Sequence, residues 1–70
     1  MALRIRRSRL PELLAKNGKS QVDLANYLEV SESHISRVIR LKSNLSYVKL
    51  KLTADYLGCT IDDLVEWEYY

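Results

Sequence analysis

The sequence predicts a mainly α-helical domain built around two short helices and a tight turn. In residues 20–40, SQVDLANYLEVSESHISRVIR, a serine suited to cap a helix precedes each of two segments with apolar residues at helical spacing. The length of 70 residues suits a single domain, 1–70, with one core. Helical periodicity continues on both sides of this pair without a linker or repeat.

The first helix is expected to follow a short N-terminal segment. Ser8 is the candidate cap, Pro11 is tolerated in a first turn, and Asn17-Gly18 ends the helix. The side chains expected to face inward are Leu10, Leu13 and Leu14.

The second and third helices form the central pair. Ser20 caps the second helix, and Asp23 reaches back to it in a variant of the capping box. Ser31 caps the third helix, and Val30 before it can pack on Ile35 as a hydrophobic staple. The residues expected in the core are Leu24, Ala25 and Leu28 from the second helix and Ile35, Val38 and Ile39 from the third.

Two more helices complete the predicted set. The fourth runs from a cap at Ser46 to Leu57 and ends at Gly58, with Leu50, Thr53, Ala54 and Leu57 on its inner face. The short fifth is capped by Thr60, with Asp63 three residues later, and contributes Ile61 and Leu64. The fourth helix also carries a second apolar stripe that must be covered, formed by Val48, Leu52 and Tyr56.

Both ends of the chain alternate apolar and charged residues, which is typical of strands. If the ends pair, Arg4 and Arg6 oppose Glu66 and Glu68 on one face. The apolar face of this ribbon is then formed by Leu3, Ile5, Val65, Trp67 and Tyr69. We expect the ribbon to pack on the second stripe of the fourth helix, in the same chain or exchanged across a dimer. The alternative is an unstructured arginine arm that reaches into a minor groove of DNA.

The charge is unevenly distributed. Residues 1–51 hold all eleven Lys and Arg and four acids, a net +7, whereas residues 52–70 hold five acids and no base. Such an asymmetry favours a nucleic-acid face, and the simpler alternative is an ordinary solvated surface. One cysteine and one histidine predict neither a disulfide nor a metal site, and no catalytic set or cofactor motif is present. The chain is therefore expected to be a cytoplasmic protein without enzymatic activity, membrane segment or small-molecule ligand.

The polar face of the third helix is the candidate binding surface. It carries two arginines and several short hydroxyl side chains, namely Glu32, Ser33, Ser36, Arg37 and Arg40. Short side chains permit a close approach, while guanidinium groups reach phosphates or guanine edges, and the major groove of DNA is wide enough for a helix.

The sequence resembles the Cro/CI-type helix-turn-helix family, also called XRE, of bacterial and phage regulators. Ser20-Gln21, Leu24-Ala25, Val30-Ser31 and Ile35-Ser36 match its "TQ..LA....GVS...IS" pattern, and residues 57–64, LGCTIDDL, are similar to its C-terminal element. The resemblance covers about residues 8–66. It implies a compact five-helix lambda-repressor-like fold, with a terminal ribbon as an addition, and binding to double-stranded DNA as a homodimer. Glu29 stands where the family has glycine, which predicts a positive φ at this turn.

The resemblance and the pattern together give the expected DNA contacts, which are Gln21, Ser31, Glu32, Ser33, Ser36, Arg37, Arg40, Lys42, Ser43 and Asn44. Arg37 is the main candidate for reading a base, whereas Arg40 and Lys42 are expected at phosphates. Glu32 either accepts a hydrogen bond from a cytosine amino group or only interacts favourably with the dipole at the start of the helix. The predicted function is a sequence-specific regulator that inserts helix 31–40 in the major groove. The alternative is a protein-interaction module on the same fold, such as an antitoxin or antirepressor.

Overall fold

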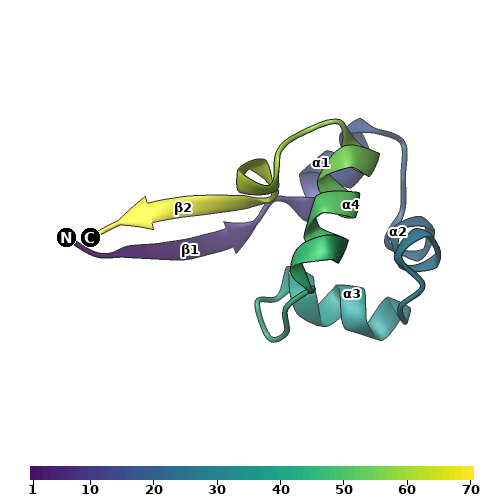
Figure 1. The fold of residues 1–70 in the computed structure, drawn as a ribbon, viewed down its shortest axis with the longest axis horizontal. Helices are drawn as coiled ribbons and strands as arrows, with labels where there is room; N and C mark the ends of the chain where they lie inside the picture. The colour runs from purple at the N-terminus through teal and green to yellow at the C-terminus, as the bar shows by residue number, and fades with distance from the viewer.

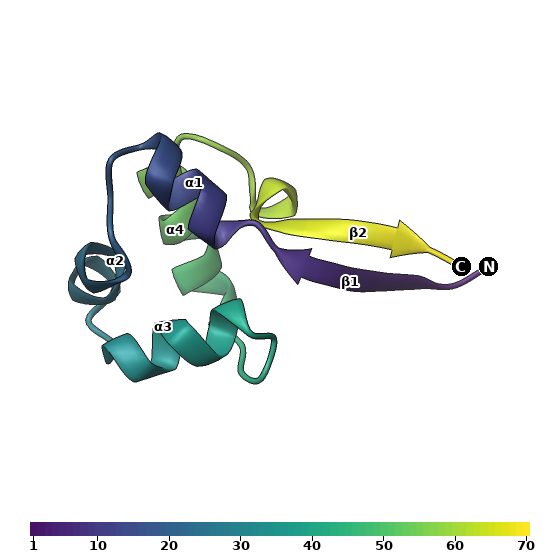
Figure 2. The same ribbon diagram turned by 180° about the vertical axis from the view of Figure 1, so that it is seen from behind.

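The chain forms a body of helices from which a two-stranded ribbon projects, with both termini at the tip of the ribbon (Figures 1 and 2). The computed structural model describes residues 1–70. In chain order the elements are β1 (Leu3–Ser8), α1 (Leu10–Lys16), α2 (Gln21–Leu28), α3 (Glu32–Ile39), α4 (Tyr47–Leu57), the 3-10 helix η1 (Ile61–Leu64) and β2 (Val65–Tyr69). None of the helices is long and apolar enough to cross a membrane.

Three helices begin at the predicted serine caps. Ser20 and Asp23 form a full capping box, in which the Ser20 Oγ accepts from the Asp23 N–H at 3.1 Å and the Asp23 carboxylate accepts from the Ser20 N–H at 2.9 Å. The hydroxyls of Ser31 and Ser46 accept from the backbone N–H three residues later, at 3.0 and 3.3 Å. Each cap satisfies a donor that the first helical turn leaves free. The N-terminal ends of these three helices are therefore set by the local sequence, as predicted.

The start of α1 differs from the prediction. Arg9, not Ser8, occupies the cap position, and no side chain caps this helix. Ser8 is instead the last residue of β1, where it pairs with Val65, and its Oγ accepts from the Leu10 N–H at 3.2 Å. Pairing in the ribbon thus extends the strand one residue further than the capping signal indicates. Pro11 lies in the first turn, as expected.

The predicted fifth helix was wrong, because the chain has four α-helices. Residues 61–64 form one turn of 3-10 helix, and β2 begins immediately after it. The Asp63 carboxylate accepts from the N–H and the hydroxyl of Thr60, at 3.1 and 2.9 Å. The predicted contact between these two residues therefore exists, but strand pairing begins before a second helical turn can form.

The core lies between the four α-helices. It contains eleven buried apolar residues: Leu10, Leu13, Leu14, Leu24, Ala25, Leu28, Ile35, Leu45, Ala54, Leu57 and Leu64. Leu24 of α2 and Ile35 of α3 are completely buried. Thr53 is also completely buried, and its hydroxyl donates to the Lys49 carbonyl at 2.7 Å, so no polar group is left unpaired there.

The two ends of the chain pair as an antiparallel ribbon, as predicted. Leu3 pairs with Tyr69, Arg4 with Glu68, and Ile5 with Trp67. The ladder then shifts at an irregularity between Ile5 and Arg7 that the sequence pattern did not predict. The charged face carries four ion pairs: Arg4–Glu68 at 2.9 Å, Arg6–Glu66 at 3.0 Å, Arg7–Glu66 at 2.6 Å and Arg7–Glu12 at 3.4 Å. The N-terminal arginines therefore form a strand and not an unstructured arm.

Within one chain the ribbon does not pack on the second stripe of α4, which corrects that part of the prediction. Val48 and Leu52 are 68% and 39% exposed, because the ribbon projects away from the helices (Figure 1). Tyr56, the third residue of the stripe, is covered by α2 instead, where its ring stacks on Tyr27 with centroids 4.3 Å apart. The version in which the ribbon meets α4 of a second chain stays a proposal.

Two residues other than glycine have a left-handed backbone. Glu29 has φ 58° and ψ 42° at the turn between α2 and α3, which confirms the predicted positive φ. Leu41, just after α3, has φ 60° and was not predicted. The Leu41 N–H donates to the Val38 carbonyl at 3.0 Å, so this conformation ends α3 where glycine is usual.

We expect Glu29→Gly to leave the thermal stability unchanged or to raise it slightly. Glycine relieves a left-handed strain of roughly 1 kcal/mol but adds freedom to the unfolded chain. The matched control is Glu29→Ala, which removes the carboxylate and retains the strain. Thermal melts of both variants test this, and a glycine variant that melts several degrees below the alanine variant would contradict it.

Candidate nucleic-acid interface

One side of α3 is buried and the opposite side is open. Ile35 faces the core, and because each residue turns an α-helix by about 100°, Ser33 and Arg37 lie roughly opposite it. Arg40 lies on the same outer side. In Figure 1, α3 forms the lower edge of the body, and no other element covers its lower side. Burial of Ile35 therefore fixes which side chains of α3 point outward.

The predicted contact residues divide by exposure. Seven of them are exposed: Ser31, Glu32, Ser33, Arg37, Arg40, Lys42 and Asn44. Gln21, Ser36 and Ser43 are half-buried. Gln21 is the first residue of α2, and Lys42, Ser43 and Asn44 follow the end of α3. The set therefore comes from α3, from the residues just after it and from the start of α2.

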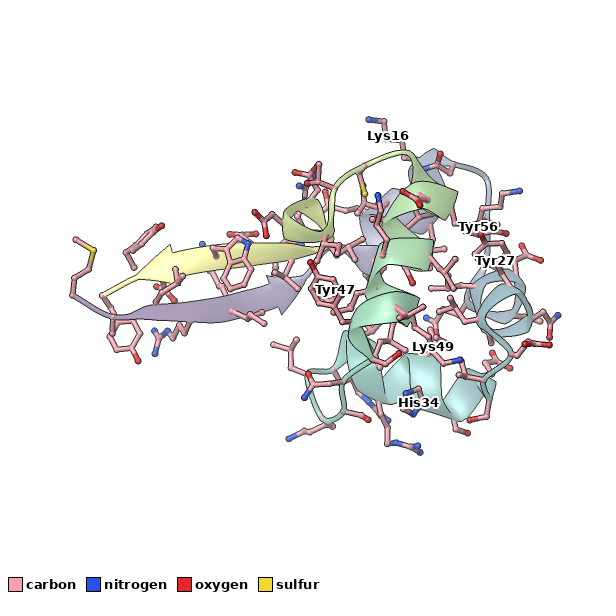
Figure 3. The ribbon with its side chains drawn as sticks, viewed as in Figure 1. Lys16, Tyr27, His34, Tyr47, Lys49 and Tyr56 are labelled. Atoms are coloured by element: carbon pink, nitrogen blue, oxygen red, sulfur yellow. The ribbon has the colours of Figure 1, made fainter.

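The fold separates paired from unpaired cations. The six salt bridges involve Arg4, Arg6, Arg7, Arg9 and Lys51. Arg37, Arg40 and Lys42 form no ion pair. Lys16, which is also unpaired, points away at the opposite edge of the body (Figure 3). Much of the positive charge of the N-terminal half is therefore neutralised in and beside the ribbon, and the free guanidinium groups remain on α3 and directly after it.

A family model described as helix-turn-helix matches residues 12–64, which is more than half of the chain. The chain belongs to this helix-turn-helix family. The resemblance of residues 20–40 to Cro/CI-type regulators is thereby confirmed, and α2 and α3 are the two helices of the motif. A search of curated proteins finds no match.

Lys49 of α4 holds the first helix of the helix-turn-helix motif in place. Its Nζ donates to the Leu28 carbonyl at 2.8 Å, across 21 residues of sequence (Figure 3). This carbonyl belongs to the last turn of α2, where the helix leaves its carbonyls unpaired and favours a positive charge. Sequence analysis missed this contact, because a lysine on a helix carries no local signal of a partner so far along the chain.

An aromatic stack beside this hydrogen bond also joins α2 to α4. Tyr27 of α2 stacks on Tyr56 of α4, and the Lys19 ammonium lies 5.3 Å from the centre of the Tyr56 ring (Figure 3). Together with the Lys49 contact, this stack fixes α2 against α4. The orientation of the helix-turn-helix motif on the body therefore depends on α4.

The residues after α3 border a cavity of about 150 Å³ at the base of the ribbon. Its lining is mostly apolar and includes Ile5 and Trp67 of the ribbon, Leu41, and Leu50 of α4. Ser43 and Asn44 also line it, so these two predicted DNA contacts lie between the cavity and the outer surface.

The capping box that starts α2 should make stability depend on pH. The backbone N–H of Ser20, and then its side chain, lower the pKa of Asp23 from its ordinary value. The folded pKa is below the unfolded one, so this stabilisation is present above the unfolded pKa of about 3.9 and is lost as the pH falls through the folded pKa.

We therefore expect Asp23→Ala to lower the Tm at neutral pH. The difference in Tm between this variant and the wild type should shrink below about pH 4. Asp23→Asn is the matched control, because it keeps the size of the side chain without its charge and should lose the same pH dependence. Melts from pH 7 to pH 2 measure this, and a difference that stays constant over the whole range would rule out the carboxylate as the cause.

Proposed function

We propose that this protein is a sequence-specific transcriptional regulator of the bacterial and phage Cro/CI type, which binds double-stranded DNA by inserting α3 into the major groove. The observation that carries the proposal is the outer side of α3, where Arg37 and Arg40 have no acidic partner and stand beside short hydroxyl side chains. A helix of this kind fits the major groove, and arginine can bind guanine O6 and N7 with two hydrogen bonds.

The proposed roles divide the interface into reading and positioning contacts. Arg37, opposite the buried Ile35, reads a base, and Ser33 and Ser36 contact base edges or phosphate. Arg40, Lys42 and the residues after it contact phosphates and supply affinity independent of sequence. Gln21 contacts a phosphate from the start of α2. Glu32, in the first turn of α3, either accepts from cytosine or acts only on the helix dipole.

The regulator binds a two-fold related site as a homodimer, with half-sites about one helical turn apart. The alternative is a protein-interaction module, such as an antitoxin or antirepressor, that uses the acidic, aromatic C-terminal segment. One observation weighs against an acidic contact surface, because Glu66 and Glu68 are already paired with arginines of β1. Unchanged behaviour in the cell of Arg37→Ala and Arg40→Ala would favour this alternative.

The contrast between Arg37→Ala and Lys42→Ala tests the proposal. Selection from a random duplex pool first gives the preferred site. We expect Arg37→Ala to lose about 1–3 kcal/mol of discrimination at one base pair, because the lost contact reads that base. Lys42→Ala should weaken binding to matched and mismatched sites equally. It should also reduce the salt dependence of the binding constant by the amount that corresponds to about one phosphate contact.

Binding titrations of both variants on the preferred site and on single-mismatch sites give the result. If Arg37→Ala lowers the affinity for the preferred and the mismatched sites equally, Arg37 contacts a phosphate and does not read a base. Absence of any salt-dependent binding of the wild type to duplex DNA would overturn the proposed function itself.

A further inference from the structure

The ribbon has an apolar face that the rest of the chain covers only in part, at the cavity beside Ile5 and Trp67. Leu3 and Tyr69 are paired across the strands, as are Ile5 and Trp67, and the period of two places all four on the same side. We call these four residues the apolar ribbon face. All four are exposed, although a two-stranded ribbon without a packed face is marginally stable in water. This face therefore needs an apolar partner.

A second uncovered apolar surface lies on α4. It consists of Tyr47, Val48 and Leu52, all exposed, and we call it the α4 stripe. Leu50 lines the cavity at the base of the ribbon together with Ile5 and Trp67. Val48 and Leu52 are each two residues from Leu50, so they lie roughly opposite it on α4 and face away from this cavity. Tyr47 precedes Leu50 by three residues and lies on the same flank, at the start of α4 (Figure 3). Tyr47 therefore lies between the side of α4 that borders the cavity and the side that carries Val48 and Leu52.

The joint area of the two surfaces is large for a small protein. A fully exposed aromatic side chain presents roughly 150–250 Å². Tyr47, Trp67 and Tyr69 are 77%, 43% and 69% exposed, so these three alone leave about 300–450 Å² uncovered. The four aliphatic side chains enlarge the joint area toward the roughly 800 Å² that each partner contributes to a stable interface. Exposed apolar area on this scale is typical of an interaction surface.

The charges around these surfaces limit what can cover them. The arginines of β1 lie on the opposite face of the ribbon and are paired with Glu66, Glu68 and Glu12. Near the stripe, Lys51 is paired with Asp55 at 2.8 Å, and Lys49 is bound to the Leu28 carbonyl. Neither surface offers free cations to a phosphate backbone, so DNA does not suit them, whereas an uncharged apolar surface does.

We propose that a second copy of this chain covers both surfaces, so that the apolar ribbon face of each copy packs against the α4 stripe of the other about a two-fold axis. This inference rests on the proposed function, because it names the surface through which the DNA-binding dimer forms. A two-fold interface requires a self-complementary surface, and one chain carries both complementary parts, each of them exposed in the single chain. The outer side of α3 takes no part, so it stays free in both copies.

Val48→Lys and Leu3→Lys test the two parts of the surface separately. Both side chains are exposed in the single chain, so neither change removes core packing. Each variant would place a charge in the apolar interface, and we expect at least a ~10-fold rise of the dimer dissociation constant. Val22→Lys is the matched control, because Val22 is an exposed helical valine of α2 outside both surfaces. Sedimentation velocity across a concentration series, without DNA, measures the dissociation constants.

Dissociation in Val48→Lys and Leu3→Lys, with an intact dimer in Val22→Lys, supports the interface. A wild type that stays monomeric at roughly 100 μM, or a Val48→Lys variant that dimerises like the control, overturns it. Binding to a single half-site is measured on the same proteins. Specific half-site binding by a monomeric wild type would overturn only the interface, and a dimer of the expected kind that binds no DNA would overturn only the proposed function.

Discussion

The packing of α3 on α2 is the constraint on which the rest of the structure depends. Leu24 of α2 and Ile35 of α3 are completely buried in the same core, and the left-handed residue Glu29 lies at the turn between the two helices. Since Ile35 must face the core, the opposite side of α3 must face solvent, which is where Arg37 lies. Contacts from Lys49 and Tyr56 of α4 to the C-terminal end of α2 then hold the pair in one orientation. The position of the proposed binding surface is thus a consequence of core packing.

Pairing of the chain ends has a second consequence, which is electrostatic. The sequence is basic in its first part and acidic in its last, and the ribbon brings these parts together so that Arg4, Arg6 and Arg7 meet Glu66 and Glu68. Exposed ion pairs of this kind stabilise a fold only slightly. Their larger effect is to neutralise the ribbon, so that free guanidinium groups are concentrated at α3.

Local signals predicted most of the fold. The caps at Ser20, Ser31 and Ser46 and the alternating chain ends each depend on residues close in sequence or on a simple period. The positive φ at Glu29 was predicted from the resemblance to the family, which has glycine at this turn. Features set by distant contacts were not predicted. These are the ladder shift near Arg7, the absence of packing between the ribbon and the second stripe of α4, and the hydrogen bond from Lys49 to α2. The single 3-10 turn replaced a fifth helix because β2 pairs with β1 directly after it. The outer residues of α3 were predictable because burial of Ile35 decides them, whereas their contacts with DNA are still proposals.

The central claim is that core packing leaves the outer side of α3 as the surface that meets DNA, while the ribbon stays apart from it. Titration of the ¹⁵N-labelled protein with its selected duplex, followed through the backbone amide resonances, tests this most directly. The account predicts the largest shift changes in residues 31–44 and at the start of α2, with β1 and β2 little affected beyond any change in dimerisation. Changes concentrated in the ribbon, with residues 31–44 unaffected, would contradict it.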